Sequence, residues 1–226
     1  MATTPSEIYI KYIVKSEKNS TNDYFSTDLG KFALLYNELA PRVIKWYLIN
    51  RDSDVLKDIE SLLVDDIKLK KVGKHLDHVD FKLPNDFLSW SYVSAIATQG
   101  ECTDNIYLYE IRDEDRAGIL QNSLLSPSFE YRESPYTFSS GNIKIYVEKD
   151  VDIDTVYMSY YKEPEKIKLR NPSNPESQFE DIEIHLKEEV IDRIVSAMVG
   201  EFKINNTDPS FQYDKLRQHE NLFRQM

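Results

Sequence analysis

The sequence has little cysteine, little glycine and no long hydrophobic run. Its 226 residues include one cysteine, Cys102, which excludes an internal disulfide and favours a reducing compartment. Six glycines are present, and the chain lacks glycine-rich phosphate loops and the motifs H-E-x-x-H and G-x-S-x-G. The most apolar stretch, 43–49, is far shorter than the roughly 20 residues that span a membrane. Residues 1–14 lack the features of a secretory signal. We therefore expect neither a membrane span nor a common nucleotide-binding or hydrolase site.

Acidic residues outnumber basic ones, with 39 Asp and Glu against 28 Lys and Arg and a formal net charge of −11 at pH 7. Duplex-binding proteins draw their affinity from clustered Lys and Arg, so this balance argues against that class. The length fits one large domain, or a domain of about 150 residues with extensions.

Aromatic residues are plentiful, with 15 Tyr, 10 Phe and 2 Trp. Many tyrosines combined with few glycines suit rigid surfaces that are wet before assembly and buried after it. The alternative is that the tyrosines pack in strands, where aromatic residues are favoured in any case. The sequence leaves both interpretations open.

The first third of the chain is predicted to be helical after a polar start. Residues 1–24 are expected to form an N-terminal arm or a first strand. The side chains at 26–28 can cap a helix, and apolar residues then recur every three or four positions. Helices are therefore predicted over 28–63, with one helix kinked, or two helices meeting, at Pro41.

The middle of the chain changes to the alternating pattern of strands, over residues 75–161. From 75 to 83 one parity carries Val79, Phe81 and Leu83 while the other is polar, which indicates a half-buried strand. Further strands are predicted at 90–98, 106–111, 142–147 and 155–161, and a short helix between 112 and 121. The short connections favour a mainly antiparallel sheet.

The clearest helical stripe lies in residues 187–203. Its apolar positions are Val190, Ile191, Ile194, Val195, Met198, Val199 and Phe202. Residues 205–226 follow as a tail. The predicted fold class is thus α+β: N-terminal helices, a central mainly antiparallel β-sheet, a long C-terminal helix and an extended tail. The core domain is expected to span 25–204.

Few residues fit a pattern that would carry chemistry. His75 and His78 would point to opposite faces of the strand predicted there, so they could share an ion only in a loop or helix. Asp150, Asp152 and Asp154 alternate as in a calcium loop, but the turn glycine and the closing Glu are missing. We expect a non-enzymatic protein without cofactor or metal. A weak surface cation at the three aspartates is the alternative left open.

Several stretches carry a resemblance to a known family. They are Leu83-Pro84-Asn85-Asp86-Phe87-Leu88, the run from Pro127 to Thr137, Ile143-Lys144-Ile145-Tyr146, and Met158-Ser159-Tyr160-Tyr161-Lys162-Glu163-Pro164. Helices, a Leu-Pro-x-Asp-Phe turn, strands, a Tyr-Tyr-x-x-Pro element and a closing helix follow in this order over residues 25–204. The order resembles head–tail connector proteins of tailed phages. The type it resembles is the ring or neck protein of short-tailed crAss-like phages, similar to tail tubular protein A.

The resemblance implies a structural virion protein at the head–tail junction, assembled in the host cytoplasm. Twelve copies would form a ring that joins the portal protein to neighbouring tail or ring proteins and lines the channel through which genome DNA passes without specific binding. The termini would supply anchors that order on a neighbour. The candidate interface residues are Ile8, Tyr9, Tyr12, Phe211, Tyr213, Leu216, Leu222 and Phe223.

Other classes stay open beside this one. They are another phage tail or minor capsid component, a metal-dependent hydrolase that uses clustered Asp and Glu, and a cytoplasmic binding module of the host. Assembly with a portal ring separates the connector from the last two classes.

Removal of residues 209–226 tests the docking role of the tail. We expect the truncated chain to keep the circular-dichroism spectrum of the full chain, because these residues lie outside the predicted core. We expect it to be lost from purified particles, because the tail would carry the anchors for the portal. Normal incorporation of the truncated chain would refute the docking role.

Overall fold

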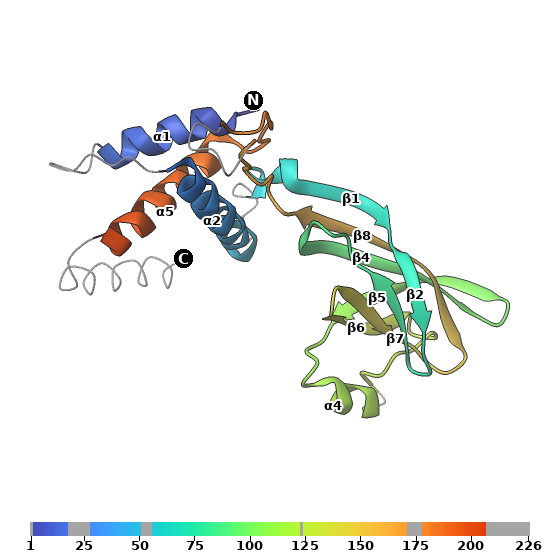
Figure 1. The fold of residues 1–226 in the computed structure, drawn as a ribbon. Coiled ribbons are helices and arrows are strands. Elements are labelled where there is room, and N and C mark those ends of the chain that lie inside the picture. The colour runs from blue at the N-terminus through green and yellow to red at the C-terminus, as the bar shows by residue number, and fades with distance from the viewer. Residues whose placement is uncertain (1, 18–27, 51–55, 123, 171–177, 207–226) are drawn as a thin grey trace. The chain divides into compact units, whose positions relative to one another are not determined.

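The computed structural model describes residues 2–17, 28–50, 56–122, 124–170 and 178–206 (Figure 1). The chain divides into two compact units. The first combines Met1–Leu62 with Glu163–Met226, and the second is Leu63–Lys162. We call them the helical unit and the sheet unit.

Helices α1 and α2 of the helical unit begin at residues with capping side chains. The unit contains α1 (Pro5–Glu17), α2 (Leu29–Asn50), the 3-10 turn η1 (Glu60–Leu62) and α5 (Glu188–Asn206). At the start of α1, the Thr4 N–H donates to Glu7 Oε2 at 2.8 Å and the Glu7 N–H donates to Thr4 Oγ1 at 3.4 Å, which is a capping box. Asp28 caps α2 by accepting from the Gly30 N–H at 3.2 Å.

Helix α5 is the element against which α1 and α2 both pack (Figure 1). The six stripe residues from Val190 to Val199 are buried, whereas the side chain of Phe202 lies outside the described part. Two lysines of α1 fasten it to α5: Lys11 Nζ lies 2.7 Å from Glu188 Oε1, and Lys15 Nζ donates to the Asp192 carbonyl at 3.1 Å. Apolar burial therefore holds the helices together, and polar contacts at their edges set the pairing of α1 with α5.

The sheet unit contains eight strands and one short helix. They are β1 (Leu63–Lys68), β2 (Lys70–Lys74), β3 (His78–Lys82), β4 (Phe87–Gln99), β5 (Cys102–Glu110), α4 (Arg116–Gln121), β6 (Glu133–Ser139), β7 (Asn142–Tyr146) and β8 (Val151–Lys162). The strand order is β1-β8-β4-β5-β6-β7-β3-β2. The β5–β6 pair is parallel and the other pairs are antiparallel.

The sheet is rolled, because its two edge strands are consecutive in the chain. β1 and β2 stand at opposite ends of the strand order, yet only Leu69 separates them. The Leu69 N–H donates to the Val156 carbonyl of β8 at 2.9 Å, and Lys71 Nζ of β2 donates to the Ile153 carbonyl at 2.9 Å. These contacts bring β2 next to β8 and close one face of the sheet around the core.

Alternate residues of the strands fill the interior of this roll. On β4 the buried residues are Val93, Ala95 and Ala97, and the residues between them face outward. The other buried residues of this core include Val79, Phe81, Ile106, Leu108, Ile143, Ile145, Val156 and Met158. The hairpins β4–β5 and β6–β7 turn at Gly100 (φ +63) and Gly141 (φ +76), where a side chain would be strained.

The α+β class predicted from the sequence is confirmed, including the mainly antiparallel sheet and the helix at 187–203. Helix α2 runs through Pro41 as one element. Ser26 and Thr27, proposed with Asp28 as capping residues, lie outside the described residues.

Three local predictions are wrong. Residues 5–17 form a helix rather than an arm or strand, Leu63 opens a strand rather than ending a helix, and the sheet begins at 63 rather than 75. The sequence pattern does not predict β1 and β2, because both strands are rich in charged residues. Register shifts at 64–67 and 71–73 also break their pairing and interrupt the alternation of apolar and polar residues.

The variant Ile194→Asp tests the role of the α5 stripe. Ile194 is fully buried, so an aspartate there places a charge in the apolar contact with α1 and α2. We expect the free energy of unfolding of the helical unit to fall by more than about 3 kcal/mol in urea titrations followed by helix ellipticity. The control is Leu34→Asp at an exposed position of α2, which should change the free energy of unfolding by less than about 1 kcal/mol. An unchanged unfolding midpoint for Ile194→Asp would contradict the packing of this helix.

Candidate functional site

The outer face of the rolled sheet carries a group of tyrosines. Tyr92 of β4 and Tyr107 of β5 are 58% and 65% exposed, because the residues that follow them, Val93 and Leu108, point into the core. Ser94 pairs with both Tyr107 and Tyr157, which places Tyr157 of β8 on the same face. Tyr109 follows two residues after Tyr107. We call these four residues, Tyr92, Tyr107, Tyr109 and Tyr157, the tyrosine face.

The segment between α4 and β6 adds apolar side chains next to this face. The Tyr109 hydroxyl donates to the carbonyl of Leu125, and the Tyr107 N–H donates to the Arg132 carbonyl at 2.8 Å, so the segment is tied to β5. Leu124, Leu125 and Tyr131 of this segment are exposed. Aromatic and apolar side chains around hydroxyl groups are typical of protein–protein interfaces.

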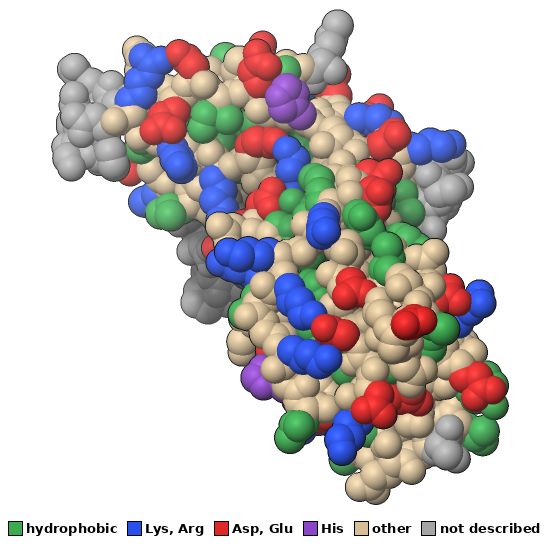
Figure 2. Space-filling view, turned by 90° about the vertical axis from the view of Figure 1, so that its right-hand side faces the viewer, with side chains coloured by type: hydrophobic (Ala, Val, Ile, Leu, Met, Phe, Trp, Pro, Cys, Tyr) green, Lys and Arg blue, Asp and Glu red, His purple; other side chains and the backbone are tan. Residues whose placement is uncertain are grey.

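Charged side chains elsewhere on the surface are mixed in sign. Figure 2 shows acidic and basic side chains interspersed over the visible face, with apolar side chains between them. Several carboxylates are paired: Arg132 lies 2.8 Å from Asp104, and Lys187 lies 3.1 Å from Asp58. On the face shown in Figure 2, charges of both signs are therefore mixed, and apolar side chains stay accessible between them.

The helical unit exposes a second apolar group. Ile10 and Val14 of α1 are four residues apart, lie on one side of that helix and are exposed. Leu34 and Ile49 of α2 are exposed as well. We call Ile10 and Val14 the α1 patch.

The N-terminal interface candidates have a different position from the one expected. Ile8 and Tyr12 are fully buried within their own chain. Tyr9 is half-buried, with its ring 5.1 Å from that of Phe32 and 5.8 Å from that of Phe179. The prediction that the N-terminal residues form an arm poor in core residues is therefore wrong, because the helical period of α1 turns Ile8 and Tyr12 inward. The capping box at Thr4–Glu7 was the signal that could have revealed this helix.

The C-terminal candidates Phe211, Tyr213, Leu216, Leu222 and Phe223 lie outside the described residues. Their role as anchors stays a prediction. None of the described helices combines the length and apolar character needed to cross a membrane.

Each unit has a surface hollow among its described residues. The hollow of the helical unit, about 440 Å³, is lined by Lys57, Asp58, Glu60, Ser61, His185, Leu186 and Lys187 together with Ala2. Its polar groups bind one another: Lys187 pairs with Asp58, and Ser61 donates to the His185 carbonyl. The hollow of the sheet unit, about 510 Å³, is lined by Glu110, Ile111, Arg112, Asp113, Thr137 and Phe138. Both are open to solvent, so neither offers the water-excluded setting in which charged groups act most strongly.

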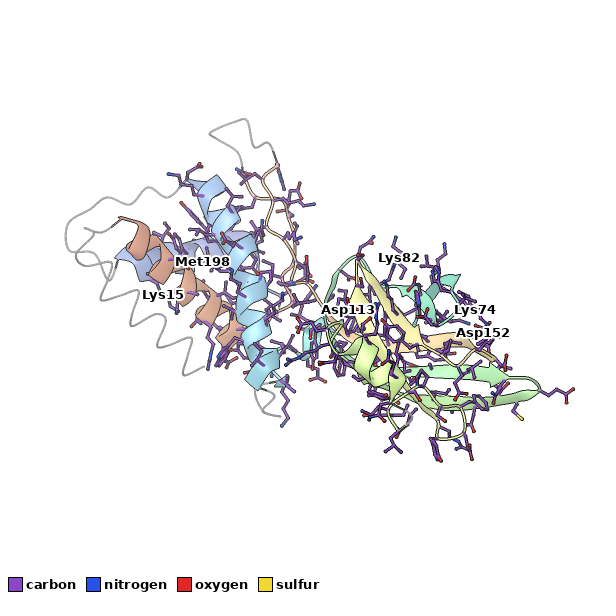
Figure 3. All side chains as sticks on the ribbon, turned by 90° about the horizontal axis from the view of Figure 1, so that it is seen from below. Lys15, Lys74, Lys82, Asp113, Asp152 and Met198 are labelled. Atoms are coloured by element: carbon purple, nitrogen blue, oxygen red, sulfur yellow. The ribbon has the colours of Figure 1, made fainter. Side chains whose placement is uncertain are left out.

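Two of the three alternating aspartates are engaged with protein groups. Lys71 Nζ lies 2.9 Å and Lys74 Nζ 3.4 Å from Asp152 Oδ1 (Figure 3). Asp154 accepts a hydrogen bond from the Thr98 hydroxyl, and Asp150 is exposed in the turn before β8. Burial on its own raises the pKa of Asp152, but the two ammonium groups outweigh it and the pKa is lowered. Lys71 and Lys74 of β2 therefore neutralise Asp152, one of the three aspartates considered as ligands of a surface cation.

The structure brings His75 and His78 together, contrary to the prediction that they point to opposite faces. The strand begins at His78, and His75 lies on the other side of a tight turn, where its N–H donates to the His78 carbonyl at 2.8 Å. The two rings stack with their centroids 4.4 Å apart. His78 Nδ1 lies 2.6 Å from Asp77 Oδ1, and this hydrogen bond lowers the pKa of Asp77. The spacing H-x-x-H around a two-residue turn was the signal in the sequence.

Cys102 is exposed at the first position of β5, beside the Gly100 turn.

Comparison with models of known protein families and with curated proteins finds no match.

The pairing of Asp152 with two lysines predicts a pH-dependent contribution to stability. Because the folded-state pKa is below the unfolded value near 3.8, the stabilisation is present above that value and is lost as the pH falls through the folded-state pKa. We expect Asp152→Asn to lower the free energy of unfolding by about 0.5–1 kcal/mol at pH 7 and by nothing measurable at a pH below the folded-state pKa of Asp152. Asp150→Asn is the matched control and should be neutral at both pH values. A deficit of Asp152→Asn that persists at low pH would contradict the pairing.

Proposed function

We propose that this chain is a structural subunit of a phage head–tail connector ring, which joins the portal to the tail and lines the DNA channel. The observation that carries the proposal is the tyrosine face: a rigid outer sheet surface with Tyr92 and Tyr107 exposed in the isolated chain. The connector-like motifs at 83–88, 127–137 and 158–164 support it independently.

Tyrosine suits a surface that must be wet in the free subunit and buried in the assembly. Its ring contributes a large apolar area, its hydroxyl group is solvated before assembly, and few rotatable bonds are immobilised. On a rolled sheet, the backbone that carries these rings is already held by hydrogen bonds on both sides of β4 and β5. Docking a partner on this face therefore has a low entropic cost.

A cyclic ring joins two different patches of neighbouring copies, head to tail. The chain offers apolar groups on both units: the tyrosine face on the sheet unit and the α1 patch, Ile10 and Val14, on the helical unit. We assign the ring contact to these two groups. The portal contact is assigned to the segment 209–226.

The acidic balance is compatible with a channel for DNA. Each copy carries a formal charge of −11, and a ring of twelve copies would present a strongly negative surface to the phosphate backbone. Repulsion of this kind keeps DNA from adhering during packaging and ejection. The protein would be found at the head–tail junction of the virion and, during assembly, in the host cytoplasm.

Sedimentation velocity and native mass spectrometry, with and without the portal oligomer of the same phage, test this function. We expect the wild-type chain to join the portal as a closed ring, even if it is monomeric alone. Failure of the wild-type chain to join the portal would overturn the proposed function.

The double variant Tyr92→Ser/Tyr107→Ser tests the surface. We expect at least a tenfold loss of assembly, because each truncation removes a desolvated aromatic contact, while the melting temperature stays within about 2 °C of the wild-type value. Val72→Ser, an exposed residue of β2 outside the tyrosine face, is the control and should assemble normally. Normal assembly of the double variant would exclude the tyrosine face as the ring contact, even if the wild-type chain joins the portal.

A further inference from the structure

The β2–β3 turn gathers three side chains that are common metal ligands. His75 ends the β2 side of the turn, His78 opens β3, and Asp80 lies two residues further on the same face as His78. The potential ligand atoms of these residues all lie within 4.8 Å of one another. His75 Nε2 is 3.4 Å from Asp80 Oδ2, and His78 Nε2 is 3.8 Å from Asp80 Oδ1.

These separations fit the distances between ligands around one small cation. Two ligands that each lie about 2.1 Å from a tetrahedral zinc ion are about 3.4 Å apart. Stacking of the two imidazole rings, with an interplanar angle of 18°, places both Nε2 atoms toward the same carboxylate. Because an imidazole nitrogen binds a metal in the plane of its ring, the His75 ring, whose side chain is 55% exposed, would have to turn out of the stack for both Nε2 atoms to reach one ion.

The hydrogen bonds around the cluster assign the proton on His78. Asp77 Oδ1 lies 2.6 Å from His78 Nδ1, so a neutral ring carries its proton on Nδ1 and leaves the Nε2 lone pair free toward Asp80. A carboxylate that orients a histidine through its second nitrogen is the usual outer partner of a metal-bound histidine.

Asp80 is the second feature of the cluster that points to a cation site. Its side chain is 14% exposed, and its Oδ1 atom is buried without a hydrogen-bond partner. A buried carboxylate oxygen without a partner costs free energy, and a bound cation would remove that cost. Lys144 stands opposite Asp80 in the β3–β7 register and is the protein group that would compete for the carboxylate.

We propose that His75 Nε2, His78 Nε2 and the Asp80 carboxylate bind a divalent transition-metal ion, with Zn²⁺ as the ion of choice. Two imidazole nitrogens and one carboxylate suit zinc, whereas Mg²⁺ and Ca²⁺ prefer oxygen ligands. Three protein ligands leave one position for water or for a side chain of another molecule. The ion would fasten the turn that ends the β2 edge of the rolled sheet. The site does not depend on ring formation.

Isothermal titration of the untagged full chain with ZnCl₂, and with MgCl₂ as the comparison, tests the site. We expect a 1:1 zinc complex with a dissociation constant in the micromolar range or tighter and no measurable magnesium binding. The variants His75→Ala and His78→Ala should each weaken zinc binding at least tenfold, and Asp77→Ala should weaken it about 10- to 100-fold. The control is His185→Ala, which removes an exposed histidine that pairs with one carboxylate, and it should bind zinc like the wild type.

Cobalt substitution gives a second measurement that does not depend on the stability of any variant. Co²⁺ bound in a four-coordinate site gives the wild-type chain an intense visible absorption, which excess Zn²⁺ should abolish. Absence of both zinc binding and the cobalt absorption overturns the proposal. Equal weakening by His185→Ala and His75→Ala also overturns it.

Discussion

The sheet unit depends on one constraint: strands β1 and β2 are joined by a single residue but occupy opposite edges of an eight-stranded sheet. The sheet must therefore roll until its edges meet at β8, where Leu69 and Lys71 make hydrogen bonds to backbone carbonyls. Rolling buries one face without help from a helix and uses the polar groups of edges that would otherwise be free to pair with other chains.

The same constraint sorts the tyrosines into two kinds. Tyr136 and Tyr160 lie on the inner face, and burial, followed by the hydrogen bond to Asp86, raises the pKa of Tyr160 to about 12. Its hydroxyl is thus a neutral donor at any physiological pH. Tyr92 and Tyr107 lie on the outer face, where the free chain covers neither. Packing within the sheet therefore accounts for Tyr136 and Tyr160, whereas burial of Tyr92 and Tyr107 in an assembly stays a prediction, on which the proposed ring contact rests.

Uninterrupted periodicity of apolar residues allowed some elements to be predicted from the sequence. The α5 stripe from Val190 to Val199 and the alternation of β4 predicted their elements correctly, because α5 keeps one apolar side along the stripe and β4 alternates regularly from Tyr92 to Ala97. α1 was missed although Thr4 and Glu7 form a capping box, since its apolar residues also looked like surface anchors. β1 and β2 were missed because bulges and lysines hide their alternation. The tyrosine face could be suspected from composition, but its members could not be chosen before the register of β4, β5 and β8 was known.

The amino-acid sequence alone determined the order of helices, strands and closing helix, and the acidic surface. These features depend on residues close together along the chain. Tertiary structure alone decided how Lys71 meets Asp152 and how the β2–β3 turn unites His75, His78 and Asp80. The physical reason is that a periodic pattern reports which side of an element is apolar. It does not report which distant element covers that side, or where a bend in the chain returns one strand to the next.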